Sequence, residues 1–350
     1  MKLTIEIFTV HKKFALQISR GTTAQTTNLW LRIQAENIEG WGEASPFSID
    51  KTQPKNTDDL LTAFKQVIPQ LEPFHPLQRQ EIATKLQTQK IPSPVQAAID
   101  MALHDWLGKK AGLPLWQIWG LNRDRIMPIS VTIGISGPED AVKRLRAWQD
   151  TLDVRRIKLK LGSPAGIKAD RAIVEAIRAV APTTKLMVDA NGGWSFDTAV
   201  EMSQWLANQD VEYIEQPLAV ADDRKLKDLS ARSPLPIFVD ESCFNSADIP
   251  RLAGTVAGIN LKIMKTGGLS EAIRAIQIAK ACKLKIMFGC YSDSSLANTA
   301  MAHLAPYADY LDLDSHLNLT DDPFCGATIE AGRLLPNYRS GLGVKHYADT

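Results

Sequence analysis

The chain has 350 residues, of which 45% are hydrophobic and 23% are charged, the balance of an ordinary soluble globular protein. Forty basic residues against 39 acidic ones leave a net charge of +1, so no overall field favours nucleic acid or an anionic membrane as a partner. No apolar stretch approaches the ~20 residues of a membrane span. The amino terminus lacks the apolar core of a signal peptide, and the four cysteines form no CxxC pair. We therefore expect a cytoplasmic protein.

The first 120 residues predict an α+β domain. The segments KLTIEIFTV, NLWLRIQAE and EGWGEA alternate like strands, and a polar loop separates the first two, so an antiparallel meander is expected. Helical periodicity follows around 58–70, 77–88 and 94–111, with Gly112 as a stop signal for the last helix. We expect these elements to form a capping domain over residues 1–120.

From residue 128 onward, strands and helices alternate. Alternation of this kind predicts a parallel sheet, and eight strand–helix units predict closure into a TIM-type (β/α) barrel. We expect an α/β barrel over residues 121–320 and a segment, 321–350, that returns to the capping domain. The eight predicted strands cover residues 129–135, 155–161, 185–190, 212–216, 236–241, 259–264, 285–291 and 310–315.

Three acidic residues recur at nearly one interval, each closing a short apolar run. Asp189, Glu215 and Asp240 lie 26 and then 25 residues apart, about the length of one strand–helix unit. The carboxyl ends of barrel strands meet at one mouth, and three oxygen ligands there suit Mg²⁺. Salt-bridged or helix-capping acids are the alternative, but the regular spacing is hard to explain that way. Zinc is disfavoured because His303 and His316 lack ligand spacing.

Two predicted strands carry lysines that point into the barrel. Alternation turns Lys158 and Lys160 to one side of the second strand. Solvated lysines at a strand end are the alternative, but in a strand covered by helices a pair of inward lysines is costly unless it is used. Lys262 lies on the sixth strand, opposite the second, so Lys160 and Lys262 would face each other across the mouth. Burial beside cations lowers a lysine pKa from near 10.4 toward that of a useful base. Two opposed bases suit proton movement at a carbon centre, whereas Lys265 fits a supporting charge.

The eighth predicted strand ends in a pair of acids. Alternation directs Asp312 and Asp314 to the same side, next to Thr132 on the first strand. Paired carboxylates that the metal does not need would bind a cation, such as a substrate ammonium group. Solvent-facing acids are the alternative, but the flanking leucines argue for a packed strand.

These features resemble the enolase superfamily, specifically its muconate-lactonizing-enzyme subgroup and within that the dipeptide epimerases. The resemblance covers nearly the full length of the chain. The aspartates of DLDS look like the pair that holds the substrate α-ammonium group in dipeptide epimerases. The other motifs that carry the resemblance are GWGEASP, DMALHDWLGKKAGLPLW, VDANGGW, IEQP, VDES and NLKIMKTGG.

The resemblance implies a reaction and a cofactor. Mg²⁺ held by the three acids would bind the carboxylate of a dipeptide, and Lys160 and Lys262 would move the α-proton of its C-terminal residue through an enediolate. A lysine or histidine base with Mg²⁺ is a general pattern of this superfamily. Lys158 would lie close to the substrate carboxylate and lower the pKa of Lys160.

The resemblance also implies further substrate contacts. Thr132, Cys290 and Ser292 fall where relatives contact their substrates. A loop near KKFALQISRGTTAQ would close over the barrel, and its Arg20 would suit the glutamate of Ala-Glu. An exposed loop charge is the alternative reading of Arg20, so hydrophobic and other Ala-Xaa dipeptides remain open. We expect a homo-oligomer that acts in cell-wall peptide metabolism.

Two other functions use the same residues. An o-succinylbenzoate synthase or a cycloisomerase of the superfamily would employ the same pair of bases. A dipeptide-binding barrel without turnover is the non-enzymatic alternative, and the presence of both lysines argues against it.

Overall fold

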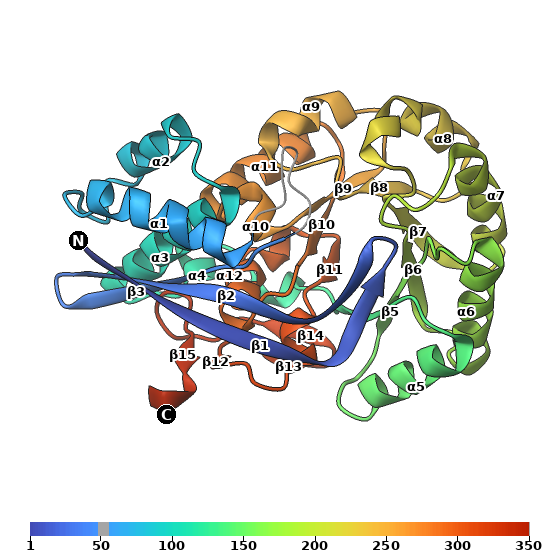
Figure 1. Ribbon diagram of the computed structural model, residues 1–350, viewed down its shortest axis with the longest axis horizontal. Helices are drawn as coiled ribbons and strands as arrows, with labels where there is room; N and C mark the ends of the chain where they lie inside the picture. Colours follow the sequence, from blue (N-terminus) through green and yellow to red (C-terminus); the bar gives the residue numbers. More distant parts are fainter. Residues whose placement is uncertain (48–55, 350) are drawn as a thin grey trace.

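The computed structural model describes residues 1–47 and 56–349, and Figure 1 shows a barrel with a smaller layer of strands and helices beside and across it. The first layer is an antiparallel sheet of β1 (Lys2–Ile18), β2 (Gly21–Ala35) and β3 (Ile38–Ala44), in that order. The polar loop expected between the first two strands is itself strand. Pairing continues past an irregularity between His11 and Leu16 until Ile18 meets Gly21, so the two strands form one long hairpin.

Helices cover one face of this sheet at the expected positions: α1 (Thr57–Leu71), α2 (Arg79–Thr88) and α3 (Ser93–Ala111).

Helix α3 lies unusually close to strand β3. A Cβ atom on Gly42 would lie 1.9 Å from the carbonyl oxygen of Ala98, and one on Gly40 would lie 2.1 Å from that of Ala102. The GWG sequence therefore lets the helix backbone pack directly on the strand backbone. Helix α3 ends at Gly112, whose φ of 71° is the left-handed conformation typical of a helix C-terminus.

Eight parallel strands form the barrel in chain order, as predicted. An isolated parallel bridge between Ile129 and Leu311 brings its first and last strands together. The sixth strand is shorter than expected because the chain turns into helix α10 (Ile263–Thr266), which leaves Lys262 in extended conformation between the two elements. The strands are β4 (Ser130–Ile133), β5 (Arg156–Lys160), β6 (Lys185–Asp189), β7 (Val211–Glu215), β8 (Ile237–Val239), β9 (Gly258–Leu261), β10 (Lys285–Gly289) and β11 (Tyr310–Asp312).

Helices surround the barrel and bury their apolar sides against its strands (Figure 1). A short helix, α4 (Leu115–Ile118), leads from the capping layer toward the barrel. The surrounding helices are α5 (Pro138–Gln149), α6 (Ile167–Val180), α7 (Phe196–Ala207), α8 (Leu226–Arg232), α9 (Ile249–Leu252), α11 (Leu269–Ala281) and α12 (Ser295–Ala302). None of the helices described is long and apolar enough to cross a membrane.

The interior of the barrel is filled by an apolar plug of Met187, Tyr213, Phe238 and Met287, all buried. The first three precede Asp189, Glu215 and Asp240 by two residues. Because side chains alternate along a strand, the plug and the acids lie on the same inner face as successive layers. The plug therefore forms a dry floor beneath the acidic residues.

The last part of the chain packs on the first sheet. It contains β12 (Phe324–Cys325), β13 (Thr328–Glu330), β14 (Arg333–Leu335) and β15 (Lys345–His346). The His346 ring stacks on Trp30 at 5.1 Å, and Phe324 meets the same ring edge-on at 5.2 Å. The domain boundaries themselves, 1–120, 121–320 and 321–350, stay a prediction.

Candidate active site

The three regularly spaced acids lie at adjacent strand ends. Asp189 and Glu215 are the last residues of β6 and β7 and are paired in register, Asp240 follows β8, and all three are fully buried. Two asparagines orient the first two acids. The Asn191 backbone N–H donates to Asp189 Oδ1 over 2.8 Å, and Asn260 Nδ2 donates to Glu215 Oε1 over 2.8 Å. Neither asparagine was among the site residues predicted from the sequence.

The two proposed bases approach this row of acids from its two sides. Lys160 Nζ lies 2.6 Å from Asp189 Oδ2, and Lys262 Nζ lies 2.7 Å from Asp240 Oδ2. Only 7% and 6% of these lysines is exposed, so both amines are inside the cavity rather than in solvent. The structure thus brings the lysines and the acids together, while their catalytic and ligand roles stay predictions.

Lys158 is more deeply buried and bridges two acids. Its Nζ lies 2.6 Å from Glu215 Oε2 and 2.7 Å from Asp312 Oδ2. Burial lowers the pKa of Lys158, but Asp312, Glu215 and Asp189 outweigh burial and raise it well above its ordinary value. Lys158 is therefore a permanent positive charge at the centre of the site.

Lys265 has the supporting role that its position suggested. Its Nζ donates to the backbone oxygens of Asp240, Cys243 and Asn260 over 2.7, 2.9 and 2.9 Å and also contacts the Asp240 carboxylate. Burial pushes the pKa of Asp240 upward, yet Lys262 and Lys265 hold it well below its usual range. Lys265 thereby keeps Asp240 ionised and ties the loop after β8 to α10.

The expected lowering of the base pKa is not found for Lys262. Burial does lower the pKa of Lys262, but Asp240 and other nearby acids outweigh burial and raise it well above the usual value. The acids of the site therefore raise the pKa of Lys262 instead of lowering it. A divalent cation bound to the same carboxylates would supply the missing positive charge.

The donor set fits such a cation by its chemistry. The three acids offer hard oxygen ligands, and among the residues described the buried atoms Glu215 Oε2 and Asp240 Oδ2 each face a lysine ammonium group and have no other hydrogen-bond partner. Within residues 1–47 and 56–349, no three acidic, His or Cys side chains lie close enough together to bind a metal ion. Each of the three carboxylates contacts a lysine ammonium group instead: Asp189 meets Lys160, Glu215 meets Lys158 and Asp240 meets Lys262.

The aspartate pair lies beside the first strand. Asp312 Oδ1 accepts hydrogen bonds from Ser130 Oγ (2.9 Å) and Thr132 Oγ1 (3.1 Å), and Asp314 Oδ2 accepts one from the Thr132 backbone N–H (2.6 Å). Burial raises the pKa of Asp312, but Lys158 outweighs it and holds the pKa below the usual value. Burial and the neighbouring Asp312 raise the pKa of Asp314 to about 6. Asp314 is therefore the acid of the pair that a further cation would stabilise most.

The strand predicted over residues 285–291 ends at Gly289 as β10, so Cys290 and Ser292 lie in the loop that follows it. The Cys290 thiol donates to the backbone oxygen of Asp312 over 3.2 Å, and burial raises its pKa to about 12. Cys290 is therefore a neutral thiol beside the aspartate pair. The Ser292 backbone oxygen accepts from Asn28 Nδ2 over 3.0 Å, which joins this loop to the capping sheet.

Arg20 occupies the turn of the long hairpin and reaches the barrel mouth. Its Nη1 donates to the backbone oxygen of Asn191 over 2.6 Å, and its Nη2 donates to Glu241 Oε1 over 2.7 Å. With 36% of its side chain exposed, Arg20 still lies partly in solvent, and its charged partner is an acid of the protein itself. Sequence reasoning missed Glu241, although its position directly after Asp240 in VDES was a signal that it lies at the mouth.

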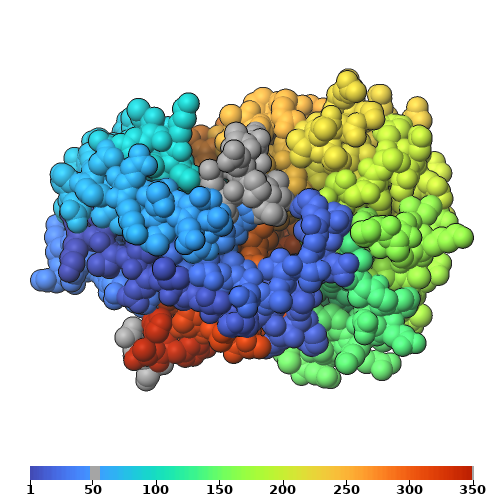
Figure 2. Space-filling model, viewed as in Figure 1, coloured from blue at the N-terminus to red at the C-terminus, as the bar shows by residue number. Residues whose placement is uncertain are grey.

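A cavity of about 610 Å³ opens beside this contact, lined by Arg20, Asn191 and Glu241 among others. In Figure 2 the blue hairpin stands at the edge of a hollow through which orange residues of the barrel are visible. The hairpin therefore forms part of the entrance to the barrel.

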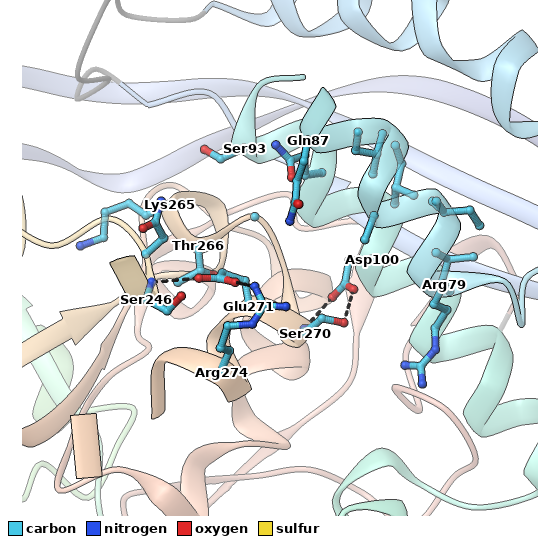
Figure 3. A pocket seen from close by; sticks show the side chains of 18 of the residues that line it. Arg79, Gln87, Ser93, Asp100, Ser246, Lys265, Thr266, Ser270, Glu271 and Arg274 are labelled. Carbon is cyan, nitrogen blue, oxygen red and sulfur yellow. Dashed lines mark hydrogen bonds and ion pairs between the residues drawn. The ribbon is translucent and has the colours of Figure 1, made fainter. Parts of the chain in front are cut away.

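A second cavity, of about 380 Å³, lies between α2 and α3 on one side and α10 and α11 on the other (Figure 3). Two acidic side chains at this cavity accept hydrogen bonds from backbone N–H groups. Asp100 accepts from the Ser270 backbone over 3.0 Å, and Glu271 accepts from the Ser246 backbone over 2.9 Å. Lys265 lines this cavity too, but its amine turns away to Asp240. The proposed bases lie outside this cavity, so we do not assign the chemistry to it.

Family profiles match both parts of the chain. The mandelate racemase / muconate lactonizing enzyme N-terminal domain matches residues 4–120, and the enolase C-terminal domain-like family matches residues 140–349. The chain belongs to the mandelate racemase / muconate lactonizing enzyme family. The expected membership of the enolase superfamily is therefore confirmed.

Relatives within this family cover nearly the whole chain. A hydrophobic dipeptide epimerase from a Flavobacteria bacterium is 42% identical over 98% of both chains. Another from Roseobacter litoralis is 40% identical over 97% of this chain and 98% of its own. The structure also matches a dipeptide epimerase from Enterococcus faecalis, solved with Mg and L-Leu-L-Tyr, with a TM-score of 0.88, 31% identity and 99% coverage of both chains.

Proposed function

We propose that the protein is a Mg²⁺-dependent dipeptide epimerase that inverts the α-carbon of the C-terminal residue of an L-Ala-Xaa dipeptide. The observation that carries this proposal is the placement of Lys160 and Lys262 on the two sides of the acidic row, each within 2.7 Å of an acid. The relatives described above are named dipeptide epimerases and match nearly the whole chain, which supports the same activity.

Each part of a dipeptide has a matching group in the site. Asp312 and Asp314 would hold the α-ammonium group. Lys158 already pairs with Asp312, so Asp314 is the acid whose negative charge is less neutralised by the protein. The permanent charge of Lys158 lies where it attracts the substrate carboxylate. Bound by Asp189, Glu215 and Asp240, Mg²⁺ would supply electrostatic stabilisation of the negative charge that builds up on that carboxylate.

The two lysines divide the proton transfer between them. One neutral amine accepts the α-proton from one face of the carbon, and the opposite ammonium group donates a proton to the other face, which inverts the centre. For the other epimer the two lysines exchange roles. The apolar plug beneath the acids keeps water from reaching the carbanionic carbon from below.

The side chain of the C-terminal residue is proposed to be neutral and apolar. Arg20, which would otherwise recognise an acidic side chain, is already compensated by Glu241 at 2.7 Å. Aromatic rings also gather near Lys262: Tyr291 lies under its amine, and Phe47 stacks on Tyr291. Two relatives that are 42% and 40% identical over nearly the whole chain are named hydrophobic dipeptide epimerases, which supports this choice over Ala-Glu.

The proposal is tested by incubating the protein and Mg²⁺ with a panel of L-Ala-L-Xaa dipeptides in D₂O. Deuterium should enter the C-terminal α-carbon and the L-Ala-D-Xaa product should appear, fastest with apolar Xaa. Lys160→Ala and Lys262→Ala should each stop inversion, while Lys280→Ala, an exposed lysine on α11, should leave it unchanged. The absence of exchange with every dipeptide, or a product that has lost water, would refute the proposal.

The setting of this reaction is also a proposal. All four cysteines are free thiols, which suits a reducing cytoplasm. A homo-oligomeric state and a role in cell-wall peptide metabolism stay predictions.

A further inference from the structure

We infer that Tyr291 positions the base Lys262, and that Phe47 from the capping layer fixes Tyr291 in place. The inference rests on the proposed function, because it assigns a role to residues around one of the two proposed bases. It adds that the capping layer affects proton transfer on the face of the α-carbon that Lys262 serves more than on the opposite face.

Three contacts form a continuous chain from the capping layer to the base. The Lys262 amine lies over the Tyr291 ring, 4.3 Å from its centroid. The Tyr291 ring is parallel to Phe47, with 4.6 Å between centroids and an interplanar angle of 2°. Phe47 in turn meets Phe244, in the loop after β8, at 6.3 Å. The base is thus linked through two rings to the chain that leaves β3.

Contacts on the faces of the ring and a hydrogen bond from the backbone hold Tyr291 in place. Its backbone N–H donates to Asp293 Oδ2 over 3.0 Å, which fixes the loop after β10. Its hydroxyl is buried and has no hydrogen-bond partner among the residues described. The orientation of the ring therefore depends on stacking with Phe47 rather than on the hydroxyl.

An aromatic face suits a base that alternately carries and loses a proton. The attraction between Lys262 and Asp240 depends on the charge of the amine, and Asp240 is shared with Lys265 and with the proposed metal. A ring attracts the ammonium form through its π-electrons and still packs against the side chain when the amine is neutral. Tyr291 therefore keeps the amine in place in both protonation states.

The opposite base is held differently. Lys160 meets Asp189 on the neighbouring strand β6, so both partners belong to the barrel sheet. Lys262 has the matching contact with Asp240, but it also packs on a ring that is stacked on a residue of the capping layer. Disturbing the ring should therefore impair the half-reaction of Lys262 and spare that of Lys160.

The experiment measures α-deuterium exchange separately for each epimer of one apolar dipeptide. The epimer that Lys262→Ala fails to exchange identifies the face that this lysine serves. In Tyr291→Leu, exchange of that epimer should fall about tenfold with little change in KM, whereas exchange of the other epimer should stay within about twofold. Phe47→Leu should act in the same direction and provides a second variant should Tyr291→Leu fail to fold.

Two controls separate positioning from general damage. Tyr291→Phe keeps the ring and should exchange both epimers at close to the wild-type rates. Tyr307→Leu removes the ring from another Lys–Tyr pair, in which Lys280 lies 4.2 Å from the ring centroid, and should change neither rate.

Equal losses for the two epimers, no loss in either ring variant, or a Tyr291→Phe defect as large as that of Tyr291→Leu would overturn the inference. These results are distinct from failure of the proposed function, in which the wild-type protein itself exchanges no dipeptide.

Discussion

Two charged residues of opposite sign, Arg20 and Glu241, form an ion pair at the mouth of the barrel. Arg20 reaches from the hairpin turn to Glu241, whose side chain is 4% exposed. Burial and the nearby acids Asp240 and Asp189 raise the pKa of Glu241, and Arg20 opposes that rise. Each of the two residues therefore neutralises the other, and the pair presents no net charge to a substrate.

Replacing Glu241 with Gln should release Arg20 for an acidic substrate. In Glu241→Gln, the ratio of kcat/KM for L-Ala-L-Glu to that for L-Ala-L-Leu should rise about tenfold, because a hydrogen bond to a charged group becomes available. Adding Arg20→Met to the same variant should remove the gain. An unchanged ratio in the single variant would mean that Arg20 does not face the substrate side chain.

Asp314 gives substrate binding a pH dependence of definite sign. Its pKa is raised to about 6 by burial and by Asp312, so its ionised fraction falls as the pH drops through that value. An ammonium group binds the ionised form, and KM for an apolar dipeptide should therefore rise as the pH is lowered below about 6. In Asp314→Asn, KM should be high already at neutral pH and vary less across this range. A wild-type KM that stays constant through the titration would contradict the assignment.

Among the helices, α12 shows how one buried side chain joins three parts of the fold. His303 follows this helix and is fully buried. Its Nδ1 accepts from the Trp116 backbone N–H over 3.2 Å, and its Nε2 contacts the Leu342 backbone oxygen at 3.0 Å. These partners fit a neutral ring protonated on Nε2. Helix α4, the barrel and the C-terminal segment therefore meet at a histidine that must stay uncharged.

This requirement predicts a loss of stability in acid. Burial lowers the pKa of His303 from 6.5 to about 4, so the unfolded chain takes up a proton at a higher pH than the folded protein does. The contribution is complete above pH 6.5 and is lost as the pH falls toward 4. Between about pH 7 and pH 5 this residue should cost about 2 kcal/mol of unfolding free energy. Urea titrations at both pH values should show a smaller difference for His303→Gln, and an identical difference would exclude this role.

The elements of the barrel were predictable from sequence because they follow local rules. The apolar runs that end in Asp189 and Glu215 have the length and alternation of strands, and their spacing matches one strand–helix unit. The long hairpin was not predictable in this way. Its outer half, around Leu16 and Thr23, is exposed or half-buried like a loop, and only pairing between the two strands makes it a sheet.

The candidate site shows the same limit. The positions of Asp189, Lys160 and Asp312 each follow from the alternation of side chains along the strand to which that residue belongs. The contacts of Arg20 with Glu241 and of Phe47 with Tyr291 join segments that are far apart in the chain. No local pattern specifies such contacts, because they depend on how the capping layer sits on the barrel.

At the scale of the whole molecule, polar contacts bind the capping layer to the barrel. The buried Glu43 of β3 accepts hydrogen bonds from Asn28 Nδ2 (2.7 Å) and from the backbone N–H groups of Ser294 (3.0 Å) and Ala297 (3.2 Å). The last two belong to the start of α12, where unpaired N–H groups need an acceptor. The capping layer is therefore attached close to the loop that carries Tyr291.

Mg²⁺ should stabilise the entire fold, because its three proposed ligands come from three successive strands. A ligand that binds only the folded state adds about 2.7 kcal/mol at a concentration of 100 times its Kd. The melting temperature should therefore rise steadily with added Mg²⁺, and EDTA should reverse the rise and stop α-proton exchange. Asp240→Asn should remove most of the Mg²⁺-dependent shift. The matched control is Glu201→Gln, an exposed acid paired with Arg171 outside the barrel, which should keep the full shift. If the melting temperature of the wild-type protein does not change with Mg²⁺, then Asp189, Glu215 and Asp240 do not bind the ion. Their ion pairs with the lysines would in that case persist in the presence of Mg²⁺.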